Sequence, residues 1–426
     1  MKNIKQALEQ KKGKIQTRGW VYRKRKQANQ VFIVLRDSNN IIQCVVEKEN
    51  KAFTDANKLL AESAIEIQGE LHKEPRAPTG YEIKVTKLNI VHLGEPFPIA
   101  KDFSVEFLAN NRHLWLRSRK MTAMLKIRST VMTAMREFWL KNNYYEYTSP
   151  IFTGLNCEGG STLFEVNYFG KPVYLSQTWQ LHAEPALFAL EKIFTIQPAF
   201  RAEKSKTSRH LTELWMAEME IAWEDFSYLQ DDVEALLKHI VKKVLDNNRE
   251  ELEILKRDIK KLEPTVKKKF PRMTYDDALK QLKDKFKLNI PWGKDLRTVE
   301  EDKLSELYDT PIIVTDYPKA VKAFYMKETE GNSKTVQGFD VIAPEHFGEI
   351  TGGSQREEDI KKVKQNLKEK GEKPKDYEFY LDTRKYGSVP HGGYGVGVER
   401  VISWICGLDN IKDAIPFPRT MERYTP

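Results

Sequence analysis

The residues best suited to phosphate chemistry lie in FRAEKSKTSRHLTELWMAEMEIA, residues 200–222. Arg201 and Glu203 end one predicted strand, and arginine is suited to holding phosphate through paired hydrogen bonds. The polar loop that follows carries Lys204, Lys206, Arg209 and His210. Glu213, Glu218 and Glu220 come next, on or near a second strand. Because positions two apart share a strand face, Glu218 and Glu220 point the same way, either into a pocket or, in a plain charged hairpin, towards water.

A second group of polar residues occupies FDVIAPEHFGEITGGSQRE, residues 339–357. Asp340 and Glu349 offer the hard oxygen ligands that Mg²⁺ takes beside substrate phosphates. Gly352 and Gly353 allow the backbone to approach a ligand, and Arg356 follows at once. Each feature taken singly also fits a surface turn, so this segment alone does not decide between a metal site and a loop.

The third group is HGGYGVGVERVISW, residues 391–404, in which alternating glycines precede Glu399, Arg400 and an apolar helix. Its spacing is not GxGxxG and it lacks GK[ST], so it is neither a dinucleotide fingerprint nor a P-loop. Alternating glycines in a strand indicate that a flat group lies against the backbone. A strand end merely weakened by glycine remains the alternative.

Other catalytic patterns are absent from the sequence. The eight histidines form no HExxH and no zinc spacing with cysteine, and no GxSxG elbow is present. The three cysteines, Cys44, Cys157 and Cys406, are far apart and odd in number. They indicate a reducing compartment without a disulfide framework, from which we expect a cytoplasmic protein.

The elements that must position these groups begin with a small all-β region, residues 15–93. Five short, β-branched, roughly alternating segments are separated by turn residues at 37–40 and 75–80. Five strands at this spacing are typical of an OB-type barrel, a fold that often binds single-stranded nucleic acid. GEPFPIA, residues 94–100, reads as a linker. We therefore place the first domain at residues 1–95 and a hinge at 96–118.

The remainder, residues 119–426, alternates helical and strand-like patterns and predicts an α+β domain. Residues 119–142 carry apolar side chains at helical spacing, and residues 229–262 return to that period within a predicted helical insertion at about 229–310. Strand-like segments are expected at 172–177, 192–200, 214–224, 311–318, 323–328, 335–343 and 378–387. RVISWICGL, at 400–408, predicts a buried helix.

Composition sets the class of protein. The chain has 426 residues, of which 31% are charged and 40% hydrophobic, with a net charge of +9. Such a composition is typical of a soluble protein of two or three domains. No apolar run approaches the roughly 18 residues needed to span a bilayer, and we expect no membrane partner. The basic balance allows a nucleic-acid partner, although a lysine-rich solvated surface would give the same charge.

In order and spacing, these segments resemble the three signature motifs of the class II aminoacyl-tRNA synthetases. The helix from 119 that leads to Pro150 resembles motif 1, FRAEKSKTSRHLTE resembles motif 2, and GYGVGVERVISWICGLDNIKDAIPFPR resembles motif 3. A barrel followed by this core resembles the aspartate/asparagine subgroup in its compact archaeal form. The resemblance implies an antiparallel six- or seven-stranded sheet flanked by helices, and a homodimer formed through motif 1.

The resemblance also implies roles for individual residues. Arg201 would grip the α-phosphate of ATP, Glu203 would read the adenine edge, and Arg400 would cover the adenine as a cation–π plate. Arg209 and His210 would reach the outer phosphates, and Leu214 stands where many relatives place a phenylalanine on the adenine. Arg201, Arg400 and Glu349 would be the catalytic set, and Asp340 with Glu349 would hold Mg²⁺. In the barrel, Phe32 would stack on an anticodon base, and the base edges would meet Gln43 and Glu82.

Asparagine and aspartate are nearly isosteric, so charge and hydrogen-bond polarity, rather than size, must separate them. In aspartyl enzymes a lysine follows three residues after the glutamine of the QSPQ segment; here that glutamine is matched by Gln180, and Ala183 replaces the lysine. Glu218 stands where those enzymes pair an aspartate with the lysine, so it accepts from a carboxamide and repels a carboxylate. The remaining predicted amino-acid contacts are Glu158, Gly352, Gly353 and Arg356. Asparagine attached to its tRNA is the expected product.

Three other functions remain open on the sequence. An aspartate–tRNA ligase, selective or not, would need the missing lysine. A tRNA-independent amide synthetase that makes asparagine shares the core but lacks the barrel. A non-catalytic RNA-binding paralogue would not need Arg201, Glu349 and Arg400.

Overall fold

The computed structural model describes residues 1–158, 162–205 and 207–426, so Lys206 of the polar loop lies outside the described residues. The chain divides into two compact units, Met1–Trp115 and Leu116–Pro426. Each unit has a hydrophobic core of its own.

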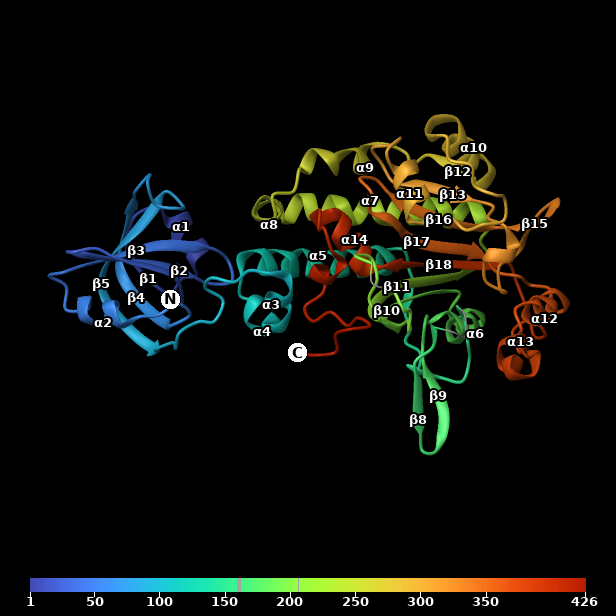
Figure 1. The fold of residues 1–426 in the computed structure, drawn as a ribbon, viewed down its shortest axis with the longest axis horizontal. Helices are drawn as coiled ribbons and strands as arrows, with labels where there is room; N and C mark the ends of the chain where they lie inside the picture. The colour runs from blue at the N-terminus through green and yellow to red at the C-terminus, as the bar shows by residue number, and fades with distance from the viewer. Residues whose placement is uncertain (159–161, 206) are drawn as a thin grey trace. The chain divides into compact units, whose positions relative to one another are not determined.

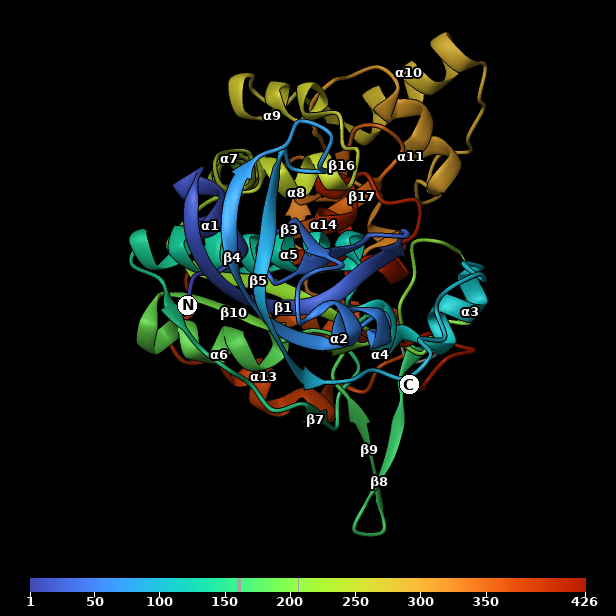
Figure 2. The same ribbon diagram turned by 90° about the vertical axis from the view of Figure 1, so that its left-hand side faces the viewer.

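The first unit is built on a closed barrel with strand order β1-β2-β3-β5-β4 (Figure 2). The strands are β1 (Gly13–Lys26), β2 (Gln30–Arg36), β3 (Ile41–Glu47), β4 (Ala64–Lys73) and β5 (Tyr81–His92). On β2, Val31, Ile33 and Leu35 are fully buried in the barrel core, whereas Phe32 and Val34 alternate with them on the outer face. The predicted five-stranded OB-type barrel is confirmed.

Four short helices complete the first unit. They are α1 (Ile4–Gln10), α2 (Phe53–Lys58), α3 (Val105–Asn110) and α4 (Arg112–Trp115). Asn3 caps α1 through its side chain, which accepts a hydrogen bond from the backbone N–H of Gln6. Ile4 and Ala7 of this helix are buried against the barrel core.

An eight-stranded sheet forms the centre of the second unit, in the order β12-β13-β16-β17-β18-β11-β10-β6 (Figure 1). From one edge to the other the strands span Arg272–Thr274, Ile312–Thr315, Gly338–Ala343, Gly348–Gln355, His391–Gly397, Glu213–Ala222, Lys192–Phe200 and Tyr145–Glu146. The six central strands are antiparallel, as predicted. At each edge the sheet adds one short parallel strand, β12 or β6, and it is therefore mixed.

One face of the sheet is covered by α5 (Arg119–Lys141), α7 (Phe226–Asn247) and α14 (Val398–Cys406) (Figure 1). The apolar stripes of α5 and α7 are buried as the period of 3.6 residues predicts, through Met121, Met124, Ile127, Val131, Val233, Leu237, Ile240 and Val244. Trp404 and Ile405 of α14 are also fully buried. The hydroxyl of Tyr394 on β18 donates to Asp232 of α7 at 2.5 Å, which ties this face of the sheet to the helices.

The stretch predicted as a helical insertion contains most of α7 together with α8 (Arg249–Ile254), α9 (Glu263–Lys267), α10 (Tyr275–Phe286) and α11 (Thr298–Ser305). It also supplies the edge strand β12. Thr274 begins α10 with a capping box, in which its side chain and that of Asp277 each accept from the other's backbone N–H. Among the described residues, no helix combines the length and the apolar character needed to cross a membrane.

Two strand predictions are wrong. Residues 378–387 begin with a helix, α13 (Glu378–Asp382), because Tyr377, Tyr380 and Leu381 fall at helical spacing and bury together against α12 (Ile360–Glu369). Residues 323–328 contain strand only from Glu328, where β14 (Glu328–Thr329) pairs with β15 (Asn332–Val336). Phe324 and Tyr325 are instead buried beneath α12 and α13.

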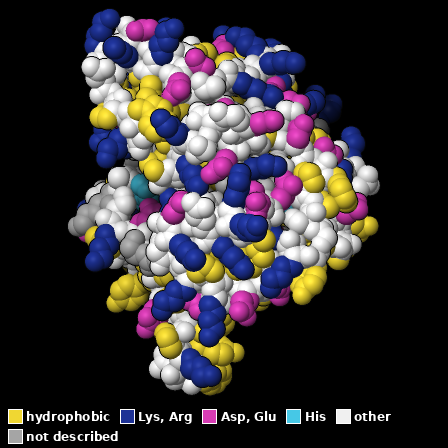
Figure 3. Space-filling model, turned by 90° about the vertical axis from the view of Figure 1, so that its right-hand side faces the viewer, with side chains coloured by type: hydrophobic (Ala, Val, Ile, Leu, Met, Phe, Trp, Pro, Cys, Tyr) yellow, Lys and Arg dark blue, Asp and Glu magenta, His cyan; other side chains and the backbone are white. Residues whose placement is uncertain are grey.

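A small antiparallel sheet projects from the second unit as an arm. It contains β7 (Phe152–Thr153), β8 (Glu165–Tyr168) and β9 (Lys171–Leu175), and both ribbon views show the β8–β9 hairpin extending away from the main sheet (Figures 1 and 2). Hydrophobic side chains gather over its tip, at the bottom of Figure 3. Tyr168 and Phe169 are both exposed there, Phe169 almost completely.

Candidate active site

A cavity of about 330 Å³ lies on the sheet face opposite α7. On β18, Tyr394 points to α7, whereas a Cβ added to its neighbour Gly393 would lie within 2.6 Å of the Glu220 carboxylate. The missing side chain there makes room for the backbone carbonyl of Met219 and for the Glu220 side chain, both on the neighbouring strand β11. Every site residue predicted outside the barrel lines this one cavity: Glu158, Gln180, Arg201, Glu203, Arg209, His210, Leu214, Glu218, Asp340, Glu349, Gly352, Gly353, Arg356 and Arg400.

Arg201 is the anion-seeking group of the cavity. It follows β10 directly, and its backbone N–H donates to the carbonyl of Thr212 at 2.9 Å across the neck of the 201–212 loop. Burial lowers the pKa of its guanidinium, but the carboxylates of Glu158, Glu203 and Glu349 outweigh burial and raise it. Within the described part of the chain, its Nε is buried without a hydrogen-bond partner. A buried guanidinium that lacks a full set of acceptors is prepared for an anionic ligand.

The second arginine, Arg400, comes from the first turn of α14. Its Nη1 donates to the carbonyl of Glu349 at 2.7 Å and lies 3.2 Å from the Glu349 carboxylate. Burial alone would raise the pKa of Glu349, but Arg400 and Lys322 outweigh it and hold that pKa below its ordinary value. Glu349 is therefore held in the charged form that a cation requires.

The loop residues predicted to reach the outer phosphates lie at one end of the cavity. Arg209 is ion-paired with Asp302 of α11 at 2.6 Å, and it also donates to the carbonyl of His346. His210 Nε2 lies 3.3 Å from the carboxylate of Glu203. Both side chains thus have acidic partners. A triphosphate that binds here would have to replace these contacts.

The predicted metal ligands are brought together by Gly352. A Cβ at this position would lie 3.3 Å from an oxygen of Glu349 and 3.4 Å from one of Asp340, so both carboxylates flank the same glycine. Burial raises the pKa of Asp340 to about 6, with Lys322 opposing the shift from 2.6 Å and Glu349 adding to it. Burial also raises the pKa of Glu301 on α11 to about 7, and Glu349 adds to that shift. Lys322 and Arg400 therefore do not neutralise all three carboxylates, those of Asp340, Glu349 and Glu301. The remaining negative charge suits a divalent cation.

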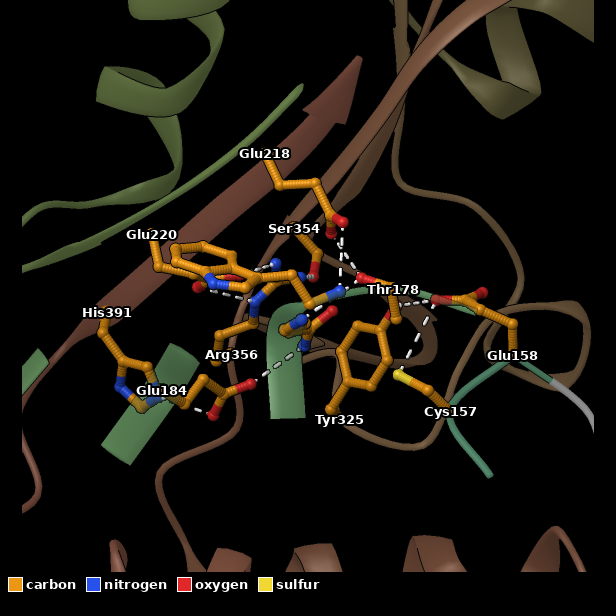
Figure 4. A network of polar contacts seen from close by, with 12 residues as sticks. Cys157, Glu158, Thr178, Glu184, Glu218, Glu220, Tyr325, Ser354, Arg356 and His391 are labelled. Atoms are coloured by element: carbon orange, nitrogen blue, oxygen red, sulfur yellow. Dashed lines mark hydrogen bonds and ion pairs between the residues drawn. The ribbon is translucent and has the colours of Figure 1, made fainter. Parts of the chain in front are cut away.

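Glu218 stands at the other end of the cavity, on β11 (Figure 4). One carboxylate oxygen accepts from the backbone N–H of Trp179 at 3.0 Å, and the other accepts from the hydroxyl of Thr178. Burial raises the pKa of Glu218, and these two hydrogen bonds oppose the shift. Each carboxylate oxygen has two acceptor sites, so Glu218 can accept a further hydrogen bond from a ligand.

Arg356 and Glu220 form a buried pair beside Glu218 (Figure 4). Arg356 donates to both oxygens of Glu220, with the Nε contact at 3.2 Å, and its Nη1 donates to Ser354 at 2.6 Å. Glu218 and Glu220 share one face of the strand, as predicted. The charge of Arg356 is already balanced by Glu220, so Arg356 presents the cavity with a hydrogen-bond donor rather than an unpaired cation.

Glu158 lies opposite this pair, where the hydroxyl of Tyr325 donates to its carboxylate at 2.9 Å (Figure 4). Its backbone N–H donates to the side chain of Gln177 at 3.0 Å. Three residues that were not predicted from the sequence, Tyr325, Thr178 and Lys322, also line the cavity. Tyr325 lies in the segment 323–328 that was wrongly predicted as a strand, Lys322 lies just before it, and no spacing signal distinguished them. Trp179 is fully buried in the core with Ala183 and Leu187, away from the cavity lining.

The residues predicted to contact the anticodon share the outer face of the barrel. Val34 on β2 is opposite Gln43 on β3, and Gln43 is opposite Glu82 on β5, to which its amide donates at 2.5 Å. Phe32 lies two residues from Val34 on the same face, and the guanidinium of Arg25 sits 4.9 Å from the centre of its ring. Phe32 is thus not a core residue, and this face combines an aromatic ring, a cation and polar edges.

Each of the two units matches a known protein family. Residues 104–421 match the model of class II tRNA synthetases (D, K and N), and residues 15–91 match the OB-fold nucleic acid binding domain. The chain therefore belongs to the class II aminoacyl-tRNA synthetases of the group specific for aspartate, lysine and asparagine.

Within that class, three similar proteins are enzymes named for asparagine alone. The chain is 46% identical over 426 residues to the asparagine–tRNA ligase of Thermococcus gammatolerans, covering 100% of this chain and 98% of that protein. It is 47% identical over 416 residues to the enzyme of the same name from Thermococcus kodakarensis, covering 97% and 96%. The crystal structure of asparaginyl-tRNA synthetase from Pyrococcus horikoshii complexed with asparaginyl-adenylate is similar at a TM-score of 0.94 and 43% identity, covering 98% of this chain and 97% of that one.

Proposed function

We propose that this chain is an asparagine–tRNA ligase, which activates L-asparagine with ATP and transfers it to the 3′ end of the asparagine tRNA. The observation that carries the proposal is Glu218, a buried carboxylate at the amino-acid end of the cavity, with Ala183 where an aspartate site needs lysine. The full-length similarity to asparagine–tRNA ligases supports the same substrate.

In the activation step, the asparagine carboxylate attacks the α-phosphate of ATP and pyrophosphate leaves. Negative charge builds on the phosphoryl oxygens, and Arg201 donates to them with the N–H groups that its protein neighbours leave free. Arg209 and His210 take the outer phosphates. Glu203 reads the adenine edge while Leu214 and Arg400 enclose the ring, Arg400 from above as a cation–π plate. No protein nucleophile is required, because the carboxylate of the substrate is the nucleophile.

Mg²⁺ is proposed as the metal, held by Asp340 and Glu349. Among the described residues no cluster of three or more potential ligands exists, and two carboxylates are what Mg²⁺ needs when phosphate oxygens and water complete its coordination. When bound there, Mg²⁺ neutralises charge on the triphosphate. The ammonium group of Lys322, 2.6 Å from Asp340, keeps that carboxylate in place and charged.

The amino-acid end selects a neutral carboxamide. Glu218 accepts from the amide NH₂ of asparagine, and Arg356 donates to the amide oxygen. Aspartate would place a second negative charge beside the buried carboxylate of Glu218, and the guanidinium of Arg356 is already balanced by Glu220. Glu158 and Gln180 receive the ammonium group, and the backbone at Gly352 and Gly353 allows the substrate to lie close to β17.

The barrel provides the contact with the tRNA. Phe32 stacks on an anticodon base and Arg25 adds a cation beside it, while Gln43 and Glu82 reach base edges. We further propose that two copies associate through the motif 1 region, where Leu140, Tyr145 and Phe152 expose apolar surface. The three cysteines are free thiols, which supports a cytoplasmic location.

Pyrophosphate exchange with asparagine and with aspartate, measured alongside ammonia-dependent synthesis, tests the proposal. Exchange that depends on asparagine supports it. Exchange mainly with aspartate would instead support an aspartate–tRNA ligase. Asparagine formed from aspartate and ammonia without tRNA would indicate an amide synthetase, and no exchange with either amino acid would indicate a non-catalytic paralogue.

A further inference from the structure

A second polar cluster lies directly beneath the amino-acid end of the cavity, and the mechanism above does not use it. Its members are Glu184 of α6 (Gln180–Leu190), Tyr380 of α13, Arg384 and His391. The side chains of Glu184, Arg384 and His391 have no exposed surface. Burying charged side chains costs free energy unless they are paired and fully hydrogen-bonded. A role in the adjacent substrate pocket would explain why this buried cluster is charged.

Glu184 is the centre of the cluster. One carboxylate oxygen accepts from the amide nitrogen of Gln180 at 2.9 Å and from the hydroxyl of Tyr380 at 2.9 Å. The other lies 2.6 Å from the guanidinium of Arg384 and 3.2 Å from Nε2 of His391. Figure 4 shows Glu184 and His391 on one side of the network, away from Glu218 and Glu158, which line the cavity.

The charge of Glu184 determines how Gln180 is oriented. Burial would raise the pKa of Glu184, but Arg384 and His391 outweigh it and bring the pKa well below its ordinary value. An ionised carboxylate can only accept hydrogen bonds. Gln180 must therefore turn its NH₂ group towards Glu184, and its carbonyl oxygen is the amide atom left for the cavity that Gln180 lines.

We propose that Glu184, held by Arg384 and His391, is a positioning residue for the amino-acid substrate: it fixes the Gln180 amide so that the carbonyl oxygen accepts a hydrogen bond from the substrate's ammonium group. Without this constraint the amide could turn over and present its NH₂ group, a donor, to a cation. The inference rests on the proposed function, because it assigns Gln180 a contact with the activated amino acid.

The expected result for Glu184→Gln is a KM for asparagine raised about tenfold, the size expected when a hydrogen bond to a charged group is lost. The KM for ATP and the kcat of pyrophosphate exchange change less than twofold. Glu345→Gln is the matched control, since Glu345 pairs with the nearly buried Arg257 at 2.5 Å outside the cavity lining. Its KM for asparagine stays at the wild-type value.

Glu184→Gln leaves Arg384 without its counter-charge, which can destabilise the fold. A second variant therefore separates a loss of stability from a loss of positioning. Glu184→Met combined with Arg384→Met removes both charges together, which proteins often tolerate, and it also removes the acceptor for Gln180. Its KM for asparagine rises as in the single variant, while its melting temperature stays near that of the wild type.

A double-mutant cycle with Gln180→Ala separates positioning from a general structural effect. In the Gln180→Ala background, Glu184→Gln adds little to the KM for asparagine, because the amide it orients is gone. Succinamic acid, which is asparagine without its ammonium group, inhibits the wild type and Glu184→Gln with the same Ki.

Additive effects in the cycle, or an equal loss of affinity for ATP and asparagine, would overturn the inference. So would an unchanged KM for asparagine in both Glu184 variants. A wild-type chain that does not activate asparagine would overturn the proposed function itself, whereas a wild type that activates asparagine beside unaffected Glu184 variants would overturn the positioning role alone.

Discussion

Replacing Glu218 by glutamine tests the origin of amino-acid selectivity. The substitution keeps the size of the side chain and removes its charge. The amide oxygen of glutamine can still accept from the N–H of Trp179, now at 3.0 Å from the carboxylate, so the fold of β11 should persist. What disappears is the negative charge that a bound aspartate side chain would face.

The magnitude follows from the position of Glu218. The side chain is buried, with the residue only 6% exposed, and two like charges about 4 Å apart at an effective dielectric constant of about 20 repel by about 4 kcal/mol. Removing that repulsion corresponds to a change in selectivity of up to about 10³-fold. Asparagine loses only the charge assistance of one hydrogen bond, about 1 kcal/mol.

The assay is pyrophosphate exchange with each amino acid in turn, reported as the ratio of kcat/KM for asparagine to that for aspartate. We expect the ratio to fall by about 10²- to 10³-fold in Glu218→Gln, mainly through improved use of aspartate, with the KM for ATP unchanged. Glu345→Gln, which also removes a charge but lies outside the cavity lining, should keep the wild-type ratio. An unchanged ratio in Glu218→Gln would refute the assignment of selectivity to this carboxylate.

Three further predictions follow. Because burial raises the pKa of Glu218 above its ordinary value, its charge is lost at a higher pH than that of a free glutamate. The selectivity ratio should therefore fall as the pH is lowered in the wild type and stay flat in Glu218→Gln, and a flat wild-type profile would contradict this. Arg201→Ala should lower kcat for adenylate formation by about 10²- to 10³-fold in single-turnover measurements with the affinity for asparagine retained, so loss of affinity alone would argue against a phosphate contact. Phe32→Ala should raise the KM for tRNA about tenfold, the size of one lost base stack, and leave pyrophosphate exchange intact; the neighbouring Val34→Ala is the control, and equal effects of the two would remove Phe32 from the anticodon contact.

The barrel and the central strands were predictable because local pattern and tertiary burial agree. On β2, Val31, Ile33 and Leu35 alternate with outward-facing Phe32, and the barrel core uses that alternation. The site residues of the second unit were predictable for a different reason. Arg201 and Glu218 fall in one segment, but Glu349 and Arg400 lie far along the chain from it, and it was the resemblance to class II motifs that brought these segments into one site.

The remainder could not be read from the sequence, because it depends on tertiary contacts. Tyr380 and Arg384 have strand-like neighbours, yet they follow the helical spacing of Tyr377 and pack beneath the substrate pocket. Glu184 is fully buried, although glutamate is seldom fully buried unless it is paired. The two parallel edge strands are only two or three residues long, too short to give a periodic signal.

The selection of asparagine is tested most directly by a competition charging experiment. The purified chain is incubated with asparagine tRNA, ATP, Mg²⁺ and equal amounts of asparagine and aspartate, and mass spectrometry identifies the amino acid attached to the tRNA 3′ end. We expect asparaginyl-tRNA with little aspartyl-tRNA. Aspartyl-tRNA as the main product, or tRNA left uncharged while asparaginyl-adenylate accumulates, would contradict that expectation.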